Sequence, residues 1–416
     1  MAMDFRFSKG LVFVSLFGGL FSMPAQALTQ EIRAGFVPDP ANPQRNRFVD
    51  QTPQSGYCTT YPTDCKTYGL SGVRLPLRFS SSLTIEPGAG QRQGAMFKIA
   101  SQWRSLTVRN VTTGEAATVE MRVGGVGSQY VLSDTAVNLT GADSDAQAHH
   151  KLWGGTNWLF PSRPCEAGAM GTHGPDFYRF FWRTPVEAVC SKQAAYRIPW
   201  MSYEYLDVGY ELRTPNPLAM SAGLYTGELN YGAGPGRDFD TGDNILPDSS
   251  SVTFRFVLDV QHVLKVDIPP GGNRIELTPQ GGWQAWLQEG RRPSRLFRDQ
   301  TFNIGVSAPF RMFIECEHPG IGACSLRDTE SGSTLPQVYL SVSLPHGITD
   351  SSGQPVKNHR LTQSGAGALF RPGHYVDRAP GVLHFEVPSH YMEDMLQPGQ
   401  AKRYTGNVTV IWDSEV

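Results

Sequence analysis

The chain ends with the stretch Tyr404-Thr-Gly-Asn-Val-Thr-Val-Ile-Trp-Asp-Ser-Glu-Val416. Apolar residues occupy alternate positions in its second half: Val408, Val410 and Trp412. Successive side chains of a β-strand point to opposite faces of a sheet, so these three would share one face. The stretch therefore predicts a final β-strand with one apolar face, introduced by a Tyr-x-Gly segment at Tyr404 and Gly406. This periodicity fits the last strand of a complete β-sandwich as well as an apolar face that lacks a partner strand.

Four further segments alternate in the same way: Ser105–Val111, Ala117–Val123, Ser251–Val257 and Gln337–Ser343. Clusters rich in Gly and Pro separate such segments, for example Glu86–Gly90 and Pro269–Asn273. Long helical periodicity is nearly absent, and only Gln280–Leu287 and Ser389–Leu396 are typical of short helical turns. Many short strands with frequent turns predict an all-β chain, made of two immunoglobulin-like β-sandwich domains.

The composition excludes several classes of protein. The 416 residues carry 36 Lys and Arg against 38 Asp and Glu, which gives a net charge of −2. Nucleic-acid-binding proteins usually present a basic face, so this balance argues against a nucleic-acid partner. Hydrophobic residues make up 40% of the chain. That share is enough for a globular core and excludes intrinsic disorder for most of the length.

Residues 1–27 have the organisation of a secretory signal peptide. Two basic residues precede an apolar run from Leu11 to Phe21, and Ala25 and Ala27 then form an A-x-A cleavage site. A membrane-spanning helix needs about 20 apolar residues, roughly twice the length of this run. We therefore expect export, with a mature chain that begins at Leu28.

The six cysteines fall into three pairs that are close in the sequence: Cys58 and Cys65, Cys165 and Cys190, and Cys316 and Cys324. An even number of cysteines in an exported protein predicts disulfides, and we expect the nearest-neighbour pairing. The alternative, a zinc site, is disfavoured because the chain has no C-x-x-C motif and no tight Cys/His cluster. We expect neither a metal nor a cofactor.

A domain boundary is expected where a long strand signal breaks. The signal runs from Ser251 to Val266, and the Pro-Pro-Gly-Gly sequence at 269–272 then interrupts it. A fresh strand signal covers Arg274–Thr278. We therefore divide the mature chain into an N-terminal domain, residues 28–263, and a C-terminal domain, residues 264–416. The second has the length of one immunoglobulin-like sandwich.

Motifs that would support catalysis are missing. The chain has no H-E-x-x-H, G-x-S-x-G, P-loop or G-x-G-x-x-G sequence, and Ala219–Gly223 has Ala where a nucleophile elbow needs its first Gly. Asp238–Asp243 resembles a calcium loop, but its Gly falls one position early and no Glu follows at the twelfth position, so we expect a turn. His149 and His150 are expected in a solvated loop. We assign no catalytic residue and expect that the protein is not an enzyme.

Two segments resemble a known family. The C-terminal stretch resembles the terminal strand of the chaperone–usher pilins of Gram-negative bacteria, which are immunoglobulin-like domains that lack their last strand. The segment Gly223-Leu-Tyr-Thr-Gly-Glu-Leu-Asn-Tyr-Gly-Ala-Gly-Pro-Gly-Arg-Asp-Phe-Asp240 is similar to a Tyr-x-Gly-x-Leu-x-Tyr, Gly-rich, Asp-Phe segment of tip-initiator subunits. These are the minor pilins of the alternate (class 5) pathway, found in colonisation-factor fimbriae and cable pili.

The resemblance implies a fimbrial tip adhesin and assembly initiator, exported through the periplasm to the tip of a fimbrium on the bacterial surface. Residues 28–263 would bind a host-cell glycan or glycoprotein, and residues 264–416 would be an incomplete pilin sandwich. Its terminal strand and groove would include Tyr404, Gly406, Val408, Val410 and Trp412. Donor-strand complementation would fill the groove, first from a periplasmic chaperone and later, at the outer-membrane usher, from the adjacent major pilin.

The mature N-terminus fits a subunit at the tip, because Pro38 and Pro40 interrupt it and it lacks a long alternating segment to donate. Two other functions stay open. One is a secreted carbohydrate-active β-sandwich enzyme, whose pair of facing carboxylates the sequence does not exclude. The other is a structural minor pilin without receptor binding.

The receptor site is expected in the aromatic stretch Phe177-Tyr-Arg-Phe-Phe-Trp-Arg183. On a strand, Arg179 and Arg183 would share a face about 13 Å apart, a span that suits an extended acidic glycan. We assign Arg179, Arg183 and Trp182 to this site. The alternative interpretation is a core strand with two exposed arginines. Two tryptophans elsewhere in this domain are expected in the core: Trp153 and Trp158.

Overall fold

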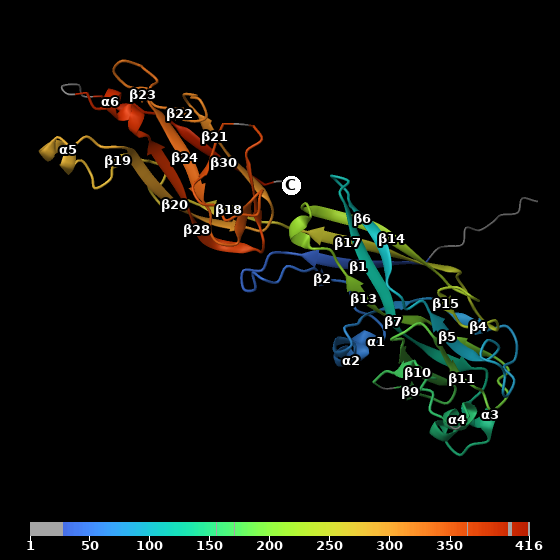
Figure 1. The fold of residues 1–416 in the computed structure, drawn as a ribbon. Coiled ribbons are helices and arrows are strands. Elements are labelled where there is room, and N and C mark those ends of the chain that lie inside the picture. Colours follow the sequence, from blue (N-terminus) through green and yellow to red (C-terminus); the bar gives the residue numbers. More distant parts are fainter. Residues whose placement is uncertain (1–27, 155, 170, 364, 398–401, 415–416) are drawn as a thin grey trace, which may run out of the picture.

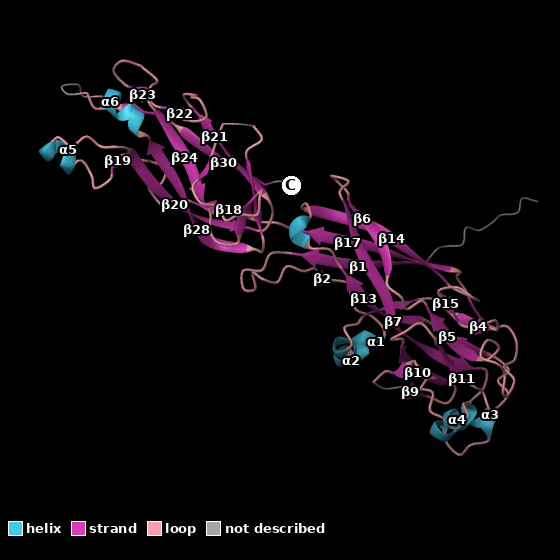
Figure 2. Cartoon of the chain, in the orientation of Figure 1, coloured by secondary structure: helices cyan, strands magenta, loops and turns pink. Residues whose placement is uncertain are grey.

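The computed structural model describes residues 28–154, 156–169, 171–363, 365–397 and 402–414. Strands dominate these residues, and the helices among them are short (Figure 2). The prediction of an all-β chain is therefore confirmed. The predicted signal peptide, residues 1–27, lies outside the described residues. None of the described helices is long and apolar enough to cross a membrane.

A 14-stranded sheet organises the first part of the chain (Figure 1). Its strands are β1 (Leu28–Phe36), β2 (Val49–Asp50), β3 (Ser71–Leu75), β4 (Phe79–Ser81), β6 (Arg104–Asn110), β7 (Ala116–Leu132), β8 (Glu166–Ala167), β9 (Thr172–His173), β10 (Phe177–Arg183), β12 (Met201–Tyr203), β13 (Leu206–Arg213), β14 (Gly223–Gly232), β16 (Ile245–Pro247) and β17 (Ser251–Val260). The main path runs β16-β4-β12-β7-β6-β14-β17-β1-β2. A second sheet contains β5 (Ala95–Ile99), β11 (Val189–Lys192) and β15 (Phe239–Asp240).

The longest strand, β7, pairs with β6, β10, β12 and β13. The sequence predicts a strand only over 117–123, and the structure extends it to Leu132. Residues 123–128 are buried on both faces of the sheet, so polar and apolar residues do not alternate there. Gly125 permits this close packing, because a Cβ at that position would lie 2.6 Å from the ring of Phe181.

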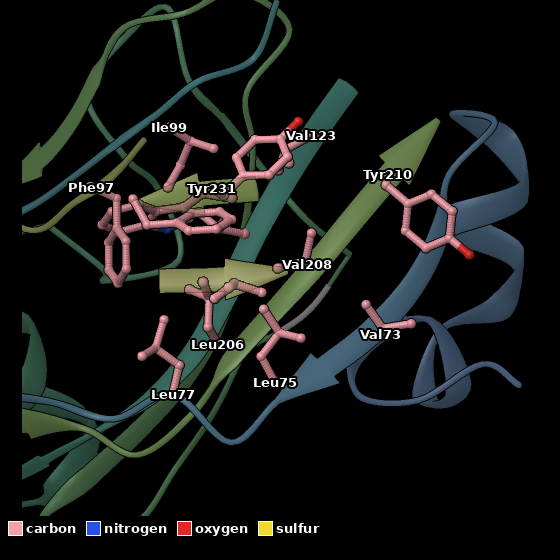
Figure 3. Close-up of a cluster of buried hydrophobic side chains, with 14 of the residues drawn as sticks. Val73, Leu75, Leu77, Phe97, Ile99, Val123, Leu206, Val208, Tyr210 and Tyr231 are labelled. Carbon is pink, nitrogen blue, oxygen red and sulfur yellow. The ribbon is translucent and has the colours of Figure 1, made fainter. Parts of the chain in front are cut away.

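Buried side chains from both sheets form one hydrophobic cluster between Ile32 and Val260. Leu75, Val123 and Val208, from three different strands, belong to it (Figure 3). Trp153 and Trp158 are also members, and their predicted burial is confirmed: Trp153 and Trp158 are 1% and 0% exposed.

Two larger sheets organise the second part of the chain. One contains β18 (Leu264–Asp267), β19 (Thr278–Pro279), β20 (Leu296–Val306), β22 (Cys324–Ser325), β24 (Gln337–Ser343), β26 (His359–Arg360) and β28 (Val376–Val387). The other contains β21 (Phe310–Cys316), β25 (Ile348–Asp350), β27 (Ala368–Pro372) and β30 (Val408–Ser414), and a separate pair joins β23 (Arg327–Asp328) to β29 (Tyr404–Thr405). Residues from both larger sheets form a second hydrophobic cluster, as in a β-sandwich. The proposed division at residue 263 separates this second cluster from the first one.

Three predicted strands are confirmed as β6, β17 and β24. Two predictions near the proposed boundary are wrong. The signal from Ser251 to Val266 is broken at residues 261–263, between β17 and β18. Of Arg274–Thr278, only Thr278 belongs to a strand. Ile275 and Leu277 instead line a groove, so their alternation reflects a one-sided apolar environment outside a sheet.

β1 is an integral strand of the first sheet. It pairs in parallel with β17 along its whole length, from Leu28 opposite Val252 to Phe36 opposite Val260. β2 pairs with it on the other side. The segment that follows the predicted cleavage site is therefore engaged within this chain's own sheet.

The helices are α1 (Tyr57–Thr60), α2 (Pro62–Thr67), α3 (Ala136–Thr140), α4 (Asp145–Leu152), α5 (Gln284–Glu289) and α6 (Met392–Met395), with 3₁₀ turns η1 (Pro217–Ala219) and η2 (Ser389–Tyr391). The two predicted helical turns are confirmed as α5 and as η2 followed by α6. The cysteines are joined in the three predicted pairs: Cys58–Cys65, Cys165–Cys190 and Cys316–Cys324.

The prediction of a solvated loop at His149 and His150 is wrong, because both lie in α4 and only His150 is exposed. His149 is held by two hydrogen bonds: Nε2 lies 2.8 Å from the Gly174 carbonyl and Nδ1 lies 2.5 Å from the Tyr130 hydroxyl. A carbonyl only accepts, so Nε2 carries a proton; because burial lowers the pKa of His149, Nδ1 is left unprotonated and accepts from the Tyr130 hydroxyl. The Tyr130 oxygen accepts in turn from Trp153 Nε1 at 3.1 Å. The network therefore requires a neutral His149.

We expect the free energy of unfolding to decrease as the pH falls below about 6.5. Burial lowers the pKa of His149 from its ordinary value. The unfolded chain therefore takes up a proton that the folded chain resists, and each pKa unit of difference corresponds to about 1.4 kcal/mol. Urea unfolding should show a smaller pH dependence in His149→Gln and an unchanged one in the neighbouring variant His150→Gln. Some dependence should persist, because burial also lowers the pKa of His262. Equal pH dependence in all three proteins would contradict the expectation.

Candidate functional site

A polar cavity of about 240 Å³, here called the arginine pocket, opens on the first sheet. Its lining residues are Tyr57, Thr60, Tyr61, Arg74, Ser128, Thr172, Arg179, Phe180, Tyr205 and Asp207. They come from α1 and the residue after it, from strands β3, β7, β9, β10 and β13, and from Tyr205 just before β13. The pocket thus combines two arginines with three tyrosines, a composition suited to sugars with an acidic group.

Arg179 supplies the uncompensated positive charge of the pocket. It lies on the exposed face of β10, and its Nε donates a 2.7 Å hydrogen bond to Gln129 Oε1. The guanidinium carbon lies 5.5 Å from the centre of the Phe177 ring. Within the described part of the chain, no carboxylate lies within salt-bridge distance of Arg179. Its remaining N–H groups are therefore available to an anionic ligand.

Arg74 has a different role, because Asp207 neutralises it. Its Nε and Nη2 donate to the two carboxylate oxygens of Asp207 at 2.7 and 2.9 Å. The guanidinium carbon also lies 3.6 Å from the centre of the Tyr205 ring. Burial raises the pKa of Asp207, against the opposing effect of the Arg74 hydrogen bonds. This bidentate pair fixes the orientation of Tyr205 at one side of the pocket.

Arg183 does not line the pocket. Its Nη2 donates to Glu166, and its guanidinium carbon lies 3.4 Å from the centre of the Tyr68 ring. Only 18% of its side chain is exposed. Phe181, between the two arginines on the same face, is covered by the ring of Tyr57 at 4.0 Å. The span from Arg179 to Arg183 is therefore interrupted, and the structure does not support one extended site along both arginines.

Trp182 is completely buried, which contradicts its assignment as a receptor contact. It occupies the core-facing side of β10, where its Nε1 donates a 3.2 Å hydrogen bond to the Trp158 carbonyl. The alternation of β10 explains the error, because the even-numbered residues face the core and the odd-numbered ones face away from it. Trp182 is a core residue.

Most residues of the pocket could not be predicted from the sequence. Tyr57 and Tyr61 are separated from Arg179 by more than a hundred residues, and Arg74 and Asp207 meet across β3 and β13. No local spacing connects these positions. The one available signal was the aromatic content of the short segments around Tyr57 and Tyr205.

A second candidate site, here called the strand groove, lies in the C-terminal sandwich and has a volume of about 350 Å³. The lining residues are Ile268, Gly272, Asn273, Ile275, Leu277, Gln300, Leu326, Val338, Leu383, Phe385, Gly406, Asn407, Val408, Val410 and Trp412. Most are apolar. β30 forms one wall, segment 268–277 forms another, and side chains of β24 and β28 contribute from the opposite sheet.

Among the described strands, only β21 pairs with β30, so one edge of β30 has no partner there. β30 pairs with β21 from Val408 opposite Cys316 to Ser414 opposite Phe310, and no other described strand pairs with it. Trp412 packs against Phe302 and Phe310, with ring centres 4.8 and 6.1 Å away. Its own side chain is only half-buried. The groove thus places apolar side chains beside a strand edge that no other described strand covers.

Segment 268–277 bulges away from the sheet. β18 and β19 both pair with β20, through Asp267 opposite Asn303 and Thr278 opposite Phe297. Between these pairs the first segment advances 278 − 267 = 11 residues, whereas β20 advances 303 − 297 = 6 residues. The five extra residues cannot stay in register with β20. Segment 268–277 therefore bulges out and forms a wall of the groove.

Most residues predicted for the terminal strand line the groove: Gly406, Val408, Val410 and Trp412. Tyr404 does not. It lies in β29, opposite Asp328 of β23. Burial raises the pKa of Tyr404 above its ordinary value.

The acidic segment Asp238–Asp243 is engaged by arginines. Arg92 contacts Asp240 at 3.0 Å and Asp243 at 2.6 Å, and Arg104 lies 3.3 Å from Asp238. The described residues contain no cluster of three or more side chains suited to a metal ion. These carboxylates therefore serve as partners of basic side chains at β15.

Comparisons with known proteins found no matching family model and no matching curated protein. Solved structures similar to this chain include a chaperone–tip adhesin complex of CFA/I fimbriae, with 11% identity over 94% of this chain and 97% of that one, at a TM-score of 0.27. A variant of the CFA/I adhesin CfaE of enterotoxigenic E. coli has 10% identity over 94% of this chain and 93% of its own, at a TM-score of 0.26. The CsuC–CsuE chaperone–tip subunit pre-assembly complex of archaic Csu pili from Acinetobacter baumannii has 10% identity over 93% of this chain and 98% of that one, at a TM-score of 0.22. A functional assignment therefore depends on the groove and the pocket of this chain.

Proposed function

We propose that this protein is a fimbrial tip adhesin and assembly initiator. Its C-terminal domain, residues 264–416, accepts a donor strand, and its N-terminal domain, residues 28–263, binds a host-surface receptor. The observation that carries the proposal is the apolar strand groove beside the unpaired edge of β30. Such an edge is an aggregation hazard unless another strand covers it, and strand addition satisfies both its main-chain groups and its apolar side chains.

The partners follow from this chemistry. A periplasmic chaperone covers the groove after export, and the outer-membrane usher exchanges it for a strand of the adjacent major pilin. β1 supports a position at the tip, because this N-terminal segment is paired in its own sheet. A subunit that accepts a strand and donates none ends the fibre.

The arginine pocket is the proposed receptor site, and the receptor is a glycan that carries a carboxylate. Arg179 supplies the free charge, and the tyrosine rings supply faces on which a sugar can pack. In this proposal the protein recognises its ligand without transforming it. The second candidate, a structural minor pilin, differs only in lacking this receptor binding.

Immunogold labelling of the bacterial surface tests the position in the fibre. Antibodies raised against residues 28–263 should label the free ends of surface fibres, with no labelling along their length. Labelling distributed along the shaft would contradict a tip subunit. Binding of the purified protein to immobilised sialyllactose, with lactose as the uncharged control, distinguishes an adhesin from a structural pilin.

A further inference from the structure

One wall of the arginine pocket is a disulfide-closed hairpin. The hairpin, residues 56–68, contains α1 and α2, and the Cys58–Cys65 bond links the two helices. Tyr57, Thr60 and Tyr61 line the pocket from this hairpin. Neither four- to six-residue helix would be stable alone, so the position of this wall depends on what holds the hairpin to the sheets.

Tyr57 is the main anchor of the hairpin. Its ring stacks on Phe181 of β10, with a centroid distance of 4.0 Å and an angle of 7°. Its hydroxyl donates to Asp64 Oδ2 at 2.6 Å and accepts from the Ala169 N–H at 2.6 Å. Burial raises the pKa of Tyr57, so the hydroxyl stays protonated as this geometry requires. One side chain therefore ties α1 to α2, to β10 and to the chain after β8.

Three glycines allow the hairpin to sit this close to its neighbours. A Cβ at Gly72 of β3 would lie 2.5 Å from Cys58 Sγ, and a Cβ at Gly168 would lie 2.7 Å from the Tyr57 hydroxyl. A Cβ at Gly56 would lie 2.2 Å from Asp207 Oδ1, the same carboxylate that holds Arg74. The buried Asp207 therefore lies against the hairpin and also holds Arg74.

We propose that the Cys58–Cys65 disulfide and Tyr57 are positioning elements of the receptor site, which hold Thr60 and Tyr61 at a set distance from Arg179. The proposal rests on the proposed function of the arginine pocket. A wall that is already ordered costs no conformational entropy when the ligand binds, so affinity depends on the closed hairpin. Receptor binding therefore requires an oxidised Cys58–Cys65 pair, although both cysteines belong to a small buried cluster separate from the main core.

The chain offers a matched control for this idea. Cys58–Cys65 spans 7 residues and Cys316–Cys324 spans 8, so their removal has a similar effect on the entropy of the unfolded chain. In the full-length protein, the double variant Cys58→Ala/Cys65→Ala should bind sialyllactose about tenfold more weakly or worse. Cys316→Ala/Cys324→Ala should bind like the unmodified protein, with a comparable decrease in melting temperature. Equal affinities in the two double variants would overturn the proposal.

Tyr57→Phe separates positioning from general stability. The variant keeps the stacked ring and loses both hydroxyl hydrogen bonds. Hydrogen exchange, which needs no ligand, should then be faster at the Ala169 amide and in residues 57–67, while exchange in the second hydrophobic cluster stays unchanged. Unchanged exchange at the Ala169 amide and in residues 57–67 would overturn the proposal.

Arg179→Gln shows whether the proposal or the proposed function has failed. If Arg179→Gln abolishes binding and the hairpin variants do not change it, the pocket is the receptor site and the positioning role is wrong. If Arg179→Gln binds normally, the receptor site lies elsewhere and the proposed pocket function is wrong. The hydrogen exchange of Tyr57→Phe then still decides whether Tyr57 holds the hairpin.

Discussion

A strand with apolar residues at alternate positions, fused behind Val416 through a flexible linker, should raise the melting temperature of residues 264–416 by about 6–12 °C. The groove exposes the half-buried side chains of Val408, Val410 and Trp412 beside an unpaired strand edge. Burying one aliphatic side chain contributes about 1.5–3 kcal/mol, and a net gain of about 3 kcal/mol produces a shift of this size in a domain of this length. Differential scanning calorimetry of the free and fused domains measures it.

Two neighbouring positions provide the control for this prediction. Val410 faces the groove and Thr409 is exposed on the opposite face of β30. In the fused protein, Val410→Asp should remove most of the gain, because it buries a charge against the added strand. Thr409→Asp should keep the gain. If residues 264–416 melt cooperatively without the added strand and do not change when it is fused, the groove is not an acceptor site.

The strands whose two faces differ could be predicted from the sequence. β6, β17 and β24 each bury one face, and β30 turns one half-buried apolar face to the groove; each appears as a period-2 pattern. The period-2 pattern is lost where both faces of a strand are buried, and it also occurs outside a sheet where one side of a segment is apolar. The centre of β7 is buried on both faces, and Ile275 and Leu277 alternate because they line a groove outside a sheet.

The two candidate sites differ in how far their residues could be predicted from the sequence. The β30 wall of the groove is local in sequence, so four lining residues could be predicted from the last strand. The arginine pocket is assembled by strand order, and only Arg179 could be identified, from the alternation of one strand. The partners of Arg183 and the burial of Trp182 depend on which face of β10 the core covers. His149 shows the same limit, because its burial follows from the position of α4 against β7 and β9.

Arg179→Ala should weaken receptor binding between about tenfold and a hundredfold, because a hydrogen bond to a charged group contributes about 1.5–3 kcal/mol. The side chain is exposed and has no carboxylate partner among the described residues, so the melting temperature should hardly change. Arg183→Ala should have the opposite profile. It breaks the contacts with Glu166 and Tyr68, so it should lower the melting temperature and leave the affinity of the remaining folded protein intact. Binding to immobilised sialyllactose and thermal melting, measured on the same preparations, decide between the two arginines. Normal binding by Arg179→Ala, or lost binding by a stable Arg183→Ala, would move the receptor site away from the pocket.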